Sequence, residues 1–345
     1  MKHLDLLVNE NISIKVAMEK INENSKGILF VVSDNSQLLG AISDGDIRRA
    51  LVDGKSINES IVNVYNKEPK VMHYYSKEIL NKYKEEFSIR TVPLVDKENK
   101  ILAVFHDGCQ LERNKSLENI PVVIMAGGLG TRLYPYTKIL PKPLIPIGDT
   151  PIIERIINQF ELFGCKKFYI IVNHKKNMII SYFAETTKKY DIEFISEDIP
   201  LGTAGGLSLL KDRIIGDFIF TNCDIIINDD MVDIVNYHLD NKNVATMIAA
   251  FKKVIIPYGV IEEKDGFIQQ LTEKPSFEFL TNTGLYVVNK ETLNYIHENE
   301  VISMPEVCER IIMNNHKVGV YKILEDNWLD MGQIEELESM REKFI

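Results

Sequence analysis

Cysteine is scarce in this sequence, and the few cysteines present are scattered. Among 345 residues there are only four, Cys109, Cys165, Cys223 and Cys308, and no two of them form a C-x-x-C pair. Zinc clusters and disulfide frameworks need paired or grouped cysteines. We therefore expect neither, and we expect all four thiols to be reduced.

Long hydrophobic runs and an excess of positive charge are also missing. No apolar stretch approaches the roughly 20 residues of a membrane-spanning helix, and the N-terminal segment 1–13 is interrupted by charges. Acidic residues outnumber basic ones by 50 to 40, a formal net charge of -10, which excludes a broad nucleic-acid or anionic-membrane surface. The sequence predicts a cytoplasmic protein in which any phosphate site is local.

What remains is an ordinary globular composition, with 45% hydrophobic and 26% charged residues. At roughly 100 to 200 residues per domain, the length predicts two or three domains, each with its own core.

The first 115 residues contain an internal repeat. Gly27–Asp46 aligns without a gap on Arg90–Cys109, at an offset of 63 residues, and both copies read as strand, tight turn, strand. A helical pattern precedes each copy, over Ile14–Asn22 and Lys77–Phe87. The sequence therefore predicts two small α/β units, each a helix packed on a hairpin.

One copy carries a recognisable motif. The run Gly40-Ala41-Ile42-Ser43-Asp44-Gly45-Asp46 resembles the G-h-h-[ST]-x-x-D signature of CBS domains. The resemblance implies a tandem regulatory module over residues 1–115, with repeats at about 6–54 and 56–112. It also implies a site for an adenine nucleotide, in which Ser43 contacts phosphate and Asp46 the ribose. The second copy has His106 and Cys109 at these positions, so at most one intact pocket is expected, and a duplicated fold without a ligand is the alternative.

The pattern of apolar and polar residues changes after a short polar link at 116–120. Buried-type strands are expected over 121–126, 168–173, 217–222, 244–251 and 284–289, and a helix over Ile152–Gly164 ends at its glycine. Strands alternating with helices predict a mostly parallel, Rossmann-like α/β sheet. In such sheets ligands bind at the carboxyl ends of the strands.

The strongest chemical signal follows the first of these strands. Gly127, Gly128 and Gly130 free the backbone N–H groups to surround phosphate oxygens. Arg132 adds a fork for bidentate phosphate binding, and Lys142 adds a second positive charge between two prolines. The spacing matches neither the dinucleotide motif G-x-G-x-x-G nor the P-loop. The stretch therefore predicts a polyphosphate site.

The motifs GGLGTRL (127–133) and PKPLIPI (141–147) resemble the signature of sugar-1-phosphate nucleotidyltransferases. The resemblance continues in order over residues 119–345, through PLGTAGGL (200–207), TNCD (221–224), YGVI (258–261), TEKP (272–275), NTGLYV (282–287) and WLDMG (328–332). It implies attack of a sugar 1-phosphate on the α-phosphorus of a nucleoside triphosphate, with release of pyrophosphate.

The resemblance also implies roles for individual residues. It implies that the catalytic residues are Arg132, Lys142, Asp224 and Lys274. It also implies that Mg²⁺ is bound by Asp224 and Asp330. The nucleotide is bound by Ala126, Gly127, Gly128, Gly130, Thr131, Arg132, Glu197, Gly202 and Thr203, and the sugar phosphate by Tyr258, Gly259, Glu273, Lys274, Asn282 and Thr283. Read without the family, Asp224 is a helix N-cap, Asp330 a turn residue, and Glu273 with Lys274 a surface ion pair.

Glu197 is the residue that indicates which base the nucleotide carries. A carboxylate only accepts hydrogen bonds, and guanine presents two adjacent N–H donors, so Glu197 favours GTP unless it is a solvated surface glutamate. A CBS pair ahead of this domain resembles the glucosamine-1-phosphate guanylyltransferases of bacterial legionaminic acid synthesis.

Several alternatives stay open at this point. Mannose-1-phosphate or heptose-1-phosphate guanylyltransferase and glucose-1-phosphate thymidylyl- or uridylyltransferase are rival activities, and an inactive nucleotide sensor is a rival of another class. A homo-oligomer is expected, because paired CBS modules commonly associate.

Overall fold

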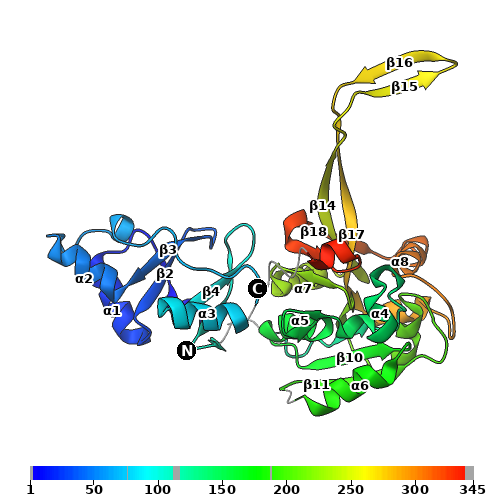
Figure 1. Cartoon of the computed structure of the whole chain (residues 1–345), viewed down its shortest axis with the longest axis horizontal. Coiled ribbons are helices and arrows are strands. Elements are labelled where there is room, and N and C mark those ends of the chain that lie inside the picture. Colours follow the sequence, from blue (N-terminus) through cyan, green and yellow to red (C-terminus); the bar gives the residue numbers. More distant parts are fainter. Residues whose placement is uncertain (1–2, 76, 112–116, 187–188, 339–345) are drawn as a thin grey trace.

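The computed structural model describes residues 3–75, 77–111, 117–186 and 189–338, and it consists of a small α/β part and a larger one (Figure 1). The small part begins with η1 (His3–Leu6), β1 (Leu7–Asn9) and α1 (Ile14–Asn24) and continues with β2 (Ile28–Val32), β3 (Leu38–Ser43), α2 (Asp44–Val52) and η2 (Ile61–Asn63). Its second half comprises α3 (Lys77–Phe87), β4 (Thr91–Val95), β5 (Ile101–His106) and β6 (Cys109–Gln110). Over the described ranges, no helix combines the length and the apolar character needed to cross a bilayer.

The internal repeat is confirmed in three dimensions. The helix α1 and the strands β2 and β3 recur as α3, β4 and β5 at the same offset of 63 residues, residue for residue. In each copy the two strands pair antiparallel. The copies diverge afterwards, because β3 leads into the helix α2 whereas β5 leads into the short strand β6.

The large part is built on a seven-stranded sheet in the order β11-β10-β7-β12-β17-β14-β18. These strands are β7 (Val122–Met125), β10 (Lys167–Val172), β11 (Asp191–Ser196), β12 (Asp217–Asn222), β14 (Ala245–Ile255), β17 (Ser276–Asn289) and β18 (Val318–Leu324). Four of the neighbouring pairs are parallel, and only the two pairs that involve β17 are antiparallel. The expected mostly parallel sheet is therefore confirmed.

Helices cover both faces of this sheet, so alternate strand residues enter two separate cores. Val122 and Ile124 pack with α5 (Ile152–Leu162), α6 (Lys176–Glu185) and α7 (Met231–Asp240). Val123 and Met125 pack with η5 (Gly205–Leu210), η6 (Lys290–Tyr295) and α8 (Met304–Met313). Burial on both faces explains why these strands read as continuous apolar runs.

Short elements connect the layers. They are η3 (Thr131–Leu133), α4 (Tyr136–Ile139), η4 (Lys142–Leu144), the pair β8 (Pro146–Ile147) and β9 (Thr150–Pro151), and η7 (Glu325–Asn327). Two further pairs are β13 (Ile225–Ile227) with β19 (Trp328–Asp330), and β15 (Val260–Lys264) with β16 (Phe267–Thr272).

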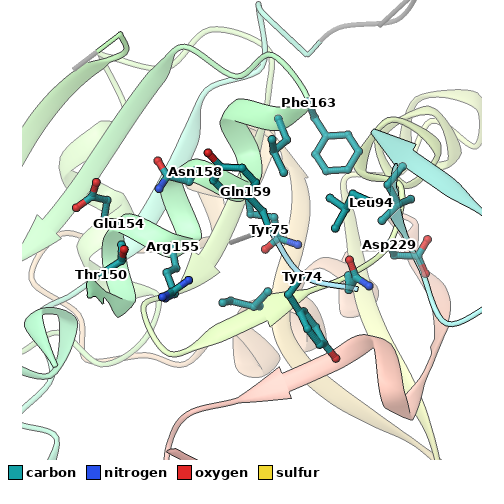
Figure 2. Close-up of a pocket in the computed structure, with 14 residues that line it drawn as sticks. Tyr74, Tyr75, Leu94, Thr150, Glu154, Arg155, Asn158, Gln159, Phe163 and Asp229 are labelled. Atoms are coloured by element: carbon teal, nitrogen blue, oxygen red, sulfur yellow. The ribbon is translucent and has the colours of Figure 1, made fainter. Parts of the chain in front are cut away.

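The second repeat packs against the large part. Side chains of β4 and β5 belong to the same apolar cluster as α5. Figure 2 shows this contact, where Tyr74 and Leu94 face Arg155 and Gln159 around a cavity of about 60 Å³. The first repeat has its own core around Ile14, Ile21 and Leu29. Over the ranges that the structure describes, the second repeat therefore shares a core with the sheet domain and the first does not.

A two-stranded ribbon, formed by β13 and β19, runs from this contact toward the end of the seven-stranded sheet at which β7 and β12 end. Asn228 Nδ2 donates to the Val95 carbonyl of the second repeat at 3.3 Å, and the Asn228 N–H donates to the Asn327 carbonyl at 2.7 Å. From these residues β13 and β19 run side by side as an antiparallel pair, in which Ile227 pairs with Trp328 and Ile225 pairs with Asp330. The far end carries Asp224 and Asp330, so the ribbon joins the repeat module directly to two carboxylates.

Candidate functional site

A cleft of about 390 Å³ opens where the parallel strands end. Its lining comprises Met125, Gly127, Gly128, Gly130, Thr131, Arg132, Lys142, Glu197, Pro200, Leu201, Gly202, Thr203, Asn222, Cys223, Asp224 and Gly332. The carboxyl ends of β7, β11 and β12 deliver Gly127, Glu197 and Asp224 to one edge. This is also the point where the strand order reverses around β7, the usual ligand position in such sheets.

In the glycine-rich loop, Gly130 adopts a left-handed backbone that favours glycine. Gly130 has φ +65°, and a Cβ there would lie 2.9 Å from Thr137 Cγ2 and 3.0 Å from Lys142 Cβ. The Gly130 carbonyl accepts a hydrogen bond from Thr137 Oγ1 at 2.8 Å. Any side chain at this position would be strained and crowded, so the glycine lets the loop close over the cleft.

Arg132 lies in η3 with its side chain exposed at the cleft. A Cβ added to Gly332 would lie 3.3 Å from the Arg132 guanidinium and 2.8 Å from Asp330 Oδ1. The guanidinium charge therefore lies beside Asp330, and it lowers the pKa of that carboxyl against the larger effect of burial.

Lys142 and Asp224 form an ion pair inside the cleft. Lys142 Nζ donates to Asp224 Oδ2, and only 11% and 12% of the two side chains are exposed. No helix begins at Asp224, since the strand β13 follows it, so the helix-cap reading of this residue is wrong. A buried ion pair of this kind holds both charges in fixed positions, at a desolvation cost that excellent geometry must offset.

Asp224 and Asp330 converge although more than a hundred residues separate them. In the β13–β19 ribbon Ile225 pairs with Asp330, and the Met331 N–H donates to the Asp224 carbonyl at 2.7 Å. Burial raises the pKa of Asp330, and the negative charge of Asp224 raises it further. Asp224 lines the cleft and Asp330 pairs with the strand that follows it, and two carboxylates that repel each other are oxygen donors that a divalent cation would stabilise. The pair therefore fits a site for a hard metal ion.

Glu197 is buried, with only 4% of the residue exposed, so it is not a solvated surface glutamate. Its Oε1 is buried, no group in the described part of the chain hydrogen-bonds it, and a Cβ on Gly206 would lie 2.4 Å from that atom. Burial raises the pKa of the carboxyl to about 7. An unpaired buried carboxylate oxygen is costly, and a ligand with N–H donors would satisfy it.

Other polar residues and a glycine in or near the cleft had no role predicted from the sequence. Asn222 and Gly332 line it. Burial raises the pKa of Glu336, the nearby charge of Asp330 raises it further, and Glu336 Oε2 is buried without a partner among the described residues. Asn222 ends β12, whereas Gly332 and Glu336 follow β19, so the positions of these two depend on the β13–β19 pairing, which no local pattern predicts.

The residues expected to face the sugar are divided between two places. Thr283 is buried and its Oγ1 donates to the Ile248 carbonyl at 2.8 Å, while Asn282 Nδ2 donates to the Tyr286 hydroxyl at 2.6 Å. Both lie where β17 crosses the sheet. Tyr258, Gly259, Glu273 and Lys274 lie instead on a projection formed by the outer ends of β14 and β17 with β15 and β16 (Figure 1). None of these four lines the cleft.

A second cleft, of about 450 Å³, lies between the two repeats. Ser43 and Asp46 line it together with Lys26, Lys70 and Arg90. Ser43 caps α2, and Asp46 Oδ2 accepts hydrogen bonds from the Ser43 N–H at 2.8 Å and the Ser43 hydroxyl at 2.6 Å. The two residues therefore have a local structural role as well as a place in a positively charged cleft.

The fold and the cleft define an α/β protein with a glycine-rich cleft at the switch point of a mostly parallel sheet. The chain belongs to the nucleotidyl transferase family, whose model matches residues 121–344. The CBS domain model matches residues 4–53.

Similar proteins are known from both sequence and structure. The chain is 32% identical to the bifunctional protein GlmU of Methanococcus aeolicus, over 61% of this chain and 51% of that protein. It is also 32% identical to a mannose-1-phosphate guanyltransferase of Yarrowia lipolytica, over 61% and 60% of the two chains. The chain thus spans between half and two thirds of the length of these relatives. The fold resembles HddC from Yersinia pseudotuberculosis, with a TM-score of 0.53 and 24% identity over 66% of this chain and all of that one.

Proposed function

We propose that the protein transfers a nucleoside monophosphate from a nucleoside triphosphate to a sugar 1-phosphate. A phosphate oxygen of the sugar 1-phosphate attacks the α-phosphorus and forms a new P–O bond. The bond between the α-phosphorus and the bridging oxygen breaks, and pyrophosphate leaves with the electron pair. The attacking oxygen is already an anion, so no general base is needed. The observation that carries this proposal is the cleft that gathers Arg132, Lys142 and Asp224 beside a glycine-rich loop.

The chain's own residues would act by position and charge. The loop N–H groups and Arg132 bind the triphosphate oxygens, and Lys142 holds its ammonium near the reacting phosphates through its ion pair with Asp224. Gly202 and Thr203 line the same cleft as Glu197. We propose that Asp224 and Asp330 hold Mg²⁺, which when bound supplies positive charge to the phosphates.

We further propose GTP as the favoured nucleotide, because Glu197 offers acceptors alone and has an unpaired buried oxygen. One relative is a mannose-1-phosphate guanyltransferase, and a neighbouring structure of HddC is a complex with GMP-PN. Glucosamine 1-phosphate, for legionaminic acid synthesis in the cytoplasm, stays our prediction for the sugar. Mannose or heptose 1-phosphate is the close alternative.

Glu197→Gln is expected to reduce the preference for GTP over UTP by about 10-fold to 100-fold. A good bidentate contact to a base is worth about 1–3 kcal/mol, and glutamine cannot accept from both guanine donors. The measurement is kcat/KM for each triphosphate. Glu193→Gln, on the same strand but outside the cleft, is the matched control. An unchanged ratio would remove Glu197 from base reading.

The same residue predicts a pH dependence of GTP binding. Burial raises the pKa of Glu197 from 4.5 to about 7, and guanine N–H donors bind the ionised form. Protonation therefore competes with GTP, and affinity should fall about tenfold between pH 8 and pH 6. Titration calorimetry on the wild type should show this fall and Glu197→Gln should not. Equal pH profiles would contradict the assignment.

We also propose that the cleft between the repeats binds an adenine nucleotide. Lys26, Lys70 and Arg90 supply positive charge for its phosphates, and Asp46 supplies acceptors for ribose hydroxyls. The β13–β19 ribbon then offers a path from this module to Asp224.

Asp46→Ala is expected to abolish AMP binding to the repeat module in calorimetry. The variant keeps the Ser43 cap of α2 but loses the Asp46 half of its capping box, which costs about 1 kcal/mol, so a thermal melt must show that it remains folded. Asp44→Ala, in the same helical turn but outside the cleft, should bind AMP normally. Undiminished binding by Asp46→Ala would refute the assignment.

A nucleotide sensor without catalysis is the alternative from another class. Pyrophosphate release, measured for several triphosphates paired with several sugar 1-phosphates, separates the two. We expect turnover with at least one pair and the highest kcat/KM with GTP. Tight nucleotide binding without turnover for every pair would favour the sensor.

A further inference from the structure

The β13–β19 ribbon stands apart from the seven-stranded sheet. Its strands pair over a short stretch, from Ile225 with Asp330 to Ile227 with Trp328, and within the described ranges neither strand pairs with a strand of the large sheet. A two-stranded pair this short is marginally stable alone. The position of the ribbon therefore depends on the groups that contact it.

One end of the ribbon holds the proposed metal ligands. Asp224 directly precedes β13, and Asp330 is the last residue of β19. The Met331 N–H donates to the Asp224 carbonyl at 2.7 Å, which joins the two strands at this end. Ligand distances in a metal site are fixed to within about 0.2 Å. A slide of one strand along the other, or a tilt of both relative to Lys142, would therefore weaken metal binding.

The other end of the ribbon is closed by two buried asparagines. Asn228 follows β13 and Asn327 precedes β19, and they are only 4% and 2% exposed. The Asn228 N–H donates to the Asn327 carbonyl at 2.7 Å, so the pair extends the ladder by one position. Buried amides are costly unless they are hydrogen-bonded, so the partners of these two side chains matter.

Both asparagine side chains bind the backbone of the second repeat. Asn228 Nδ2 donates to the Val95 carbonyl at 3.3 Å, and Asn327 Oδ1 accepts from the Lys97 N–H at 3.4 Å. Asn327 Nδ2 also donates to Asp229 Oδ2 at 3.3 Å, which orients its amide. One side chain donates and the other accepts, at backbone groups two residues apart. The contact therefore fixes the ribbon along the chain direction of the repeat as well as against it.

The ribbon is loosely packed beside this contact. Ile226, Asn228 and Asp229 border the cavity of about 60 Å³ between the second repeat and α5, and Figure 2 shows Asp229 and Leu94 beside it. Groups that border a void lack the van der Waals contacts that would otherwise hold them. The hydrogen bonds of the asparagines therefore carry a larger share of the positioning here.

We propose that Asn228 and Asn327 are positioning residues for Asp224 and Asp330. They fasten one end of the ribbon to the second repeat, and the paired strands carry that position to the carboxylates at the other end. The second repeat is then part of the scaffold of the metal site. This inference rests on the proposed function, in which the two carboxylates hold Mg²⁺.

The only tryptophan in the sequence, Trp328, makes the ribbon directly observable. It lies in β19, two residues before Asp330, so Mn²⁺ bound at the carboxylates should quench its fluorescence. A Mn²⁺ titration of the full chain without substrates then measures metal affinity. We expect Asn228→Leu and Asn327→Leu each to raise the half-saturating Mn²⁺ concentration about tenfold or more, because loss of a group that orients a metal ligand typically costs 10- to 100-fold in affinity.

Asn243→Leu is the matched control. Asn243 is also buried, and its Nδ2 donates to Thr246 Oγ1 at 3.0 Å, but it lines neither the cleft nor the ribbon contact. Its variant should lose stability in a thermal melt yet keep the wild-type Mn²⁺ titration. Asn228→Ser is a milder change, since water can occupy the freed space and bind the Val95 carbonyl, and it should fold and still weaken Mn²⁺ binding. Equal weakening by Asn243→Leu would overturn the inference. So would wild-type titrations for the Asn228 and Asn327 variants, or a wild type that Mn²⁺ does not quench.

Turnover provides an independent separation of effects. At saturating GTP the Asn228 and Asn327 variants should need about tenfold more Mg²⁺ for half-maximal pyrophosphate release and should approach the wild-type kcat when Mg²⁺ is saturating. KM for GTP should stay within about twofold, because the asparagines contact neither Arg132 nor the glycine-rich loop. An active wild type with the same Mg²⁺ dependence as its variants would overturn the inference alone. A wild type inactive with every substrate pair would instead overturn the proposed function, and the Mn²⁺ titration would still decide whether the asparagines position the carboxylates.

Discussion

Asp224→Asn is expected to reduce kcat for pyrophosphate release by about a thousandfold. Asp224 is the ion-pair partner of Lys142 and one of two carboxylates proposed to hold Mg²⁺. Asparagine keeps the shape but removes the charge that fixes the ammonium, and loss of one preorganised electrostatic group typically costs 10²- to 10³-fold. Initial rates at saturating substrates give the measurement, and activity within tenfold of wild type would contradict the role.

Stability must be separated from chemistry in this experiment. Removing one member of a buried ion pair leaves the other charge unpaired and costs about 3–5 kcal/mol. Asp224→Asn should therefore also lower Tm. The double variant Lys142→Met/Asp224→Asn removes both charges, so it should recover much of the Tm but none of the activity. Asp212→Asn, an exposed residue outside the cleft, should leave both unchanged.

Arg132→Ala is expected to raise KM for the triphosphate and to lower kcat/KM by about 100-fold to 1,000-fold. Arg132→Lys should recover little of this loss, since a single ammonium cannot form the bidentate contact of a guanidinium with phosphate. The residue is exposed at the cleft, so Tm should hardly change.

Arg213→Ala is the matched control for this pair of variants. Arg213 is also an exposed arginine, but it pairs with Glu193 and does not line the cleft. Its variant should keep the wild-type kcat/KM. If Arg132→Lys matched the wild type, positive charge alone would suffice and the bidentate role would be wrong.

The fold was readable from the sequence wherever burial leaves a pattern. The repeat appears as a fixed offset, because α1, β2 and β3 recur residue for residue as α3, β4 and β5. The strand before Gly127 and the strand before Asp224 are buried on both faces, so both show as apolar runs. Their shared edge follows from the rule that parallel strands end on one side of the sheet.

The rest depends on pairings between distant segments. Asp330 reaches Asp224 only through the β13–β19 ribbon, and without the family resemblance it reads as a turn residue. The strand expected to end at Phe251 continues to Ile255, and the strand expected to begin at Gly284 begins at Ser276. Residues 252–255 and 276–282 of these extensions are mostly exposed, so no buried run marks them and their direction is set by the ladder alone.

The shared core of the second repeat was likewise beyond prediction. The apolar positions of β4 and β5 predict burial, but the same pattern serves a core within the repeat or a contact with another domain. The Asn228 hydrogen bond to Val95 and the apolar cluster that includes Tyr74 show that β4 and β5 pack against the large domain.

The most direct test of the central claim follows the label of the triphosphate into products. The chain is incubated with Mg²⁺, glucosamine 1-phosphate and GTP that carries ³²P at either the α or the γ position. We expect the α label in a GDP-sugar and the γ label in pyrophosphate, in equal amounts, with the same partition for whichever sugar 1-phosphate is the better substrate. Release of the γ label as inorganic phosphate, or no labelled nucleotide sugar with any sugar 1-phosphate, would contradict displacement at the α-phosphorus in this cleft.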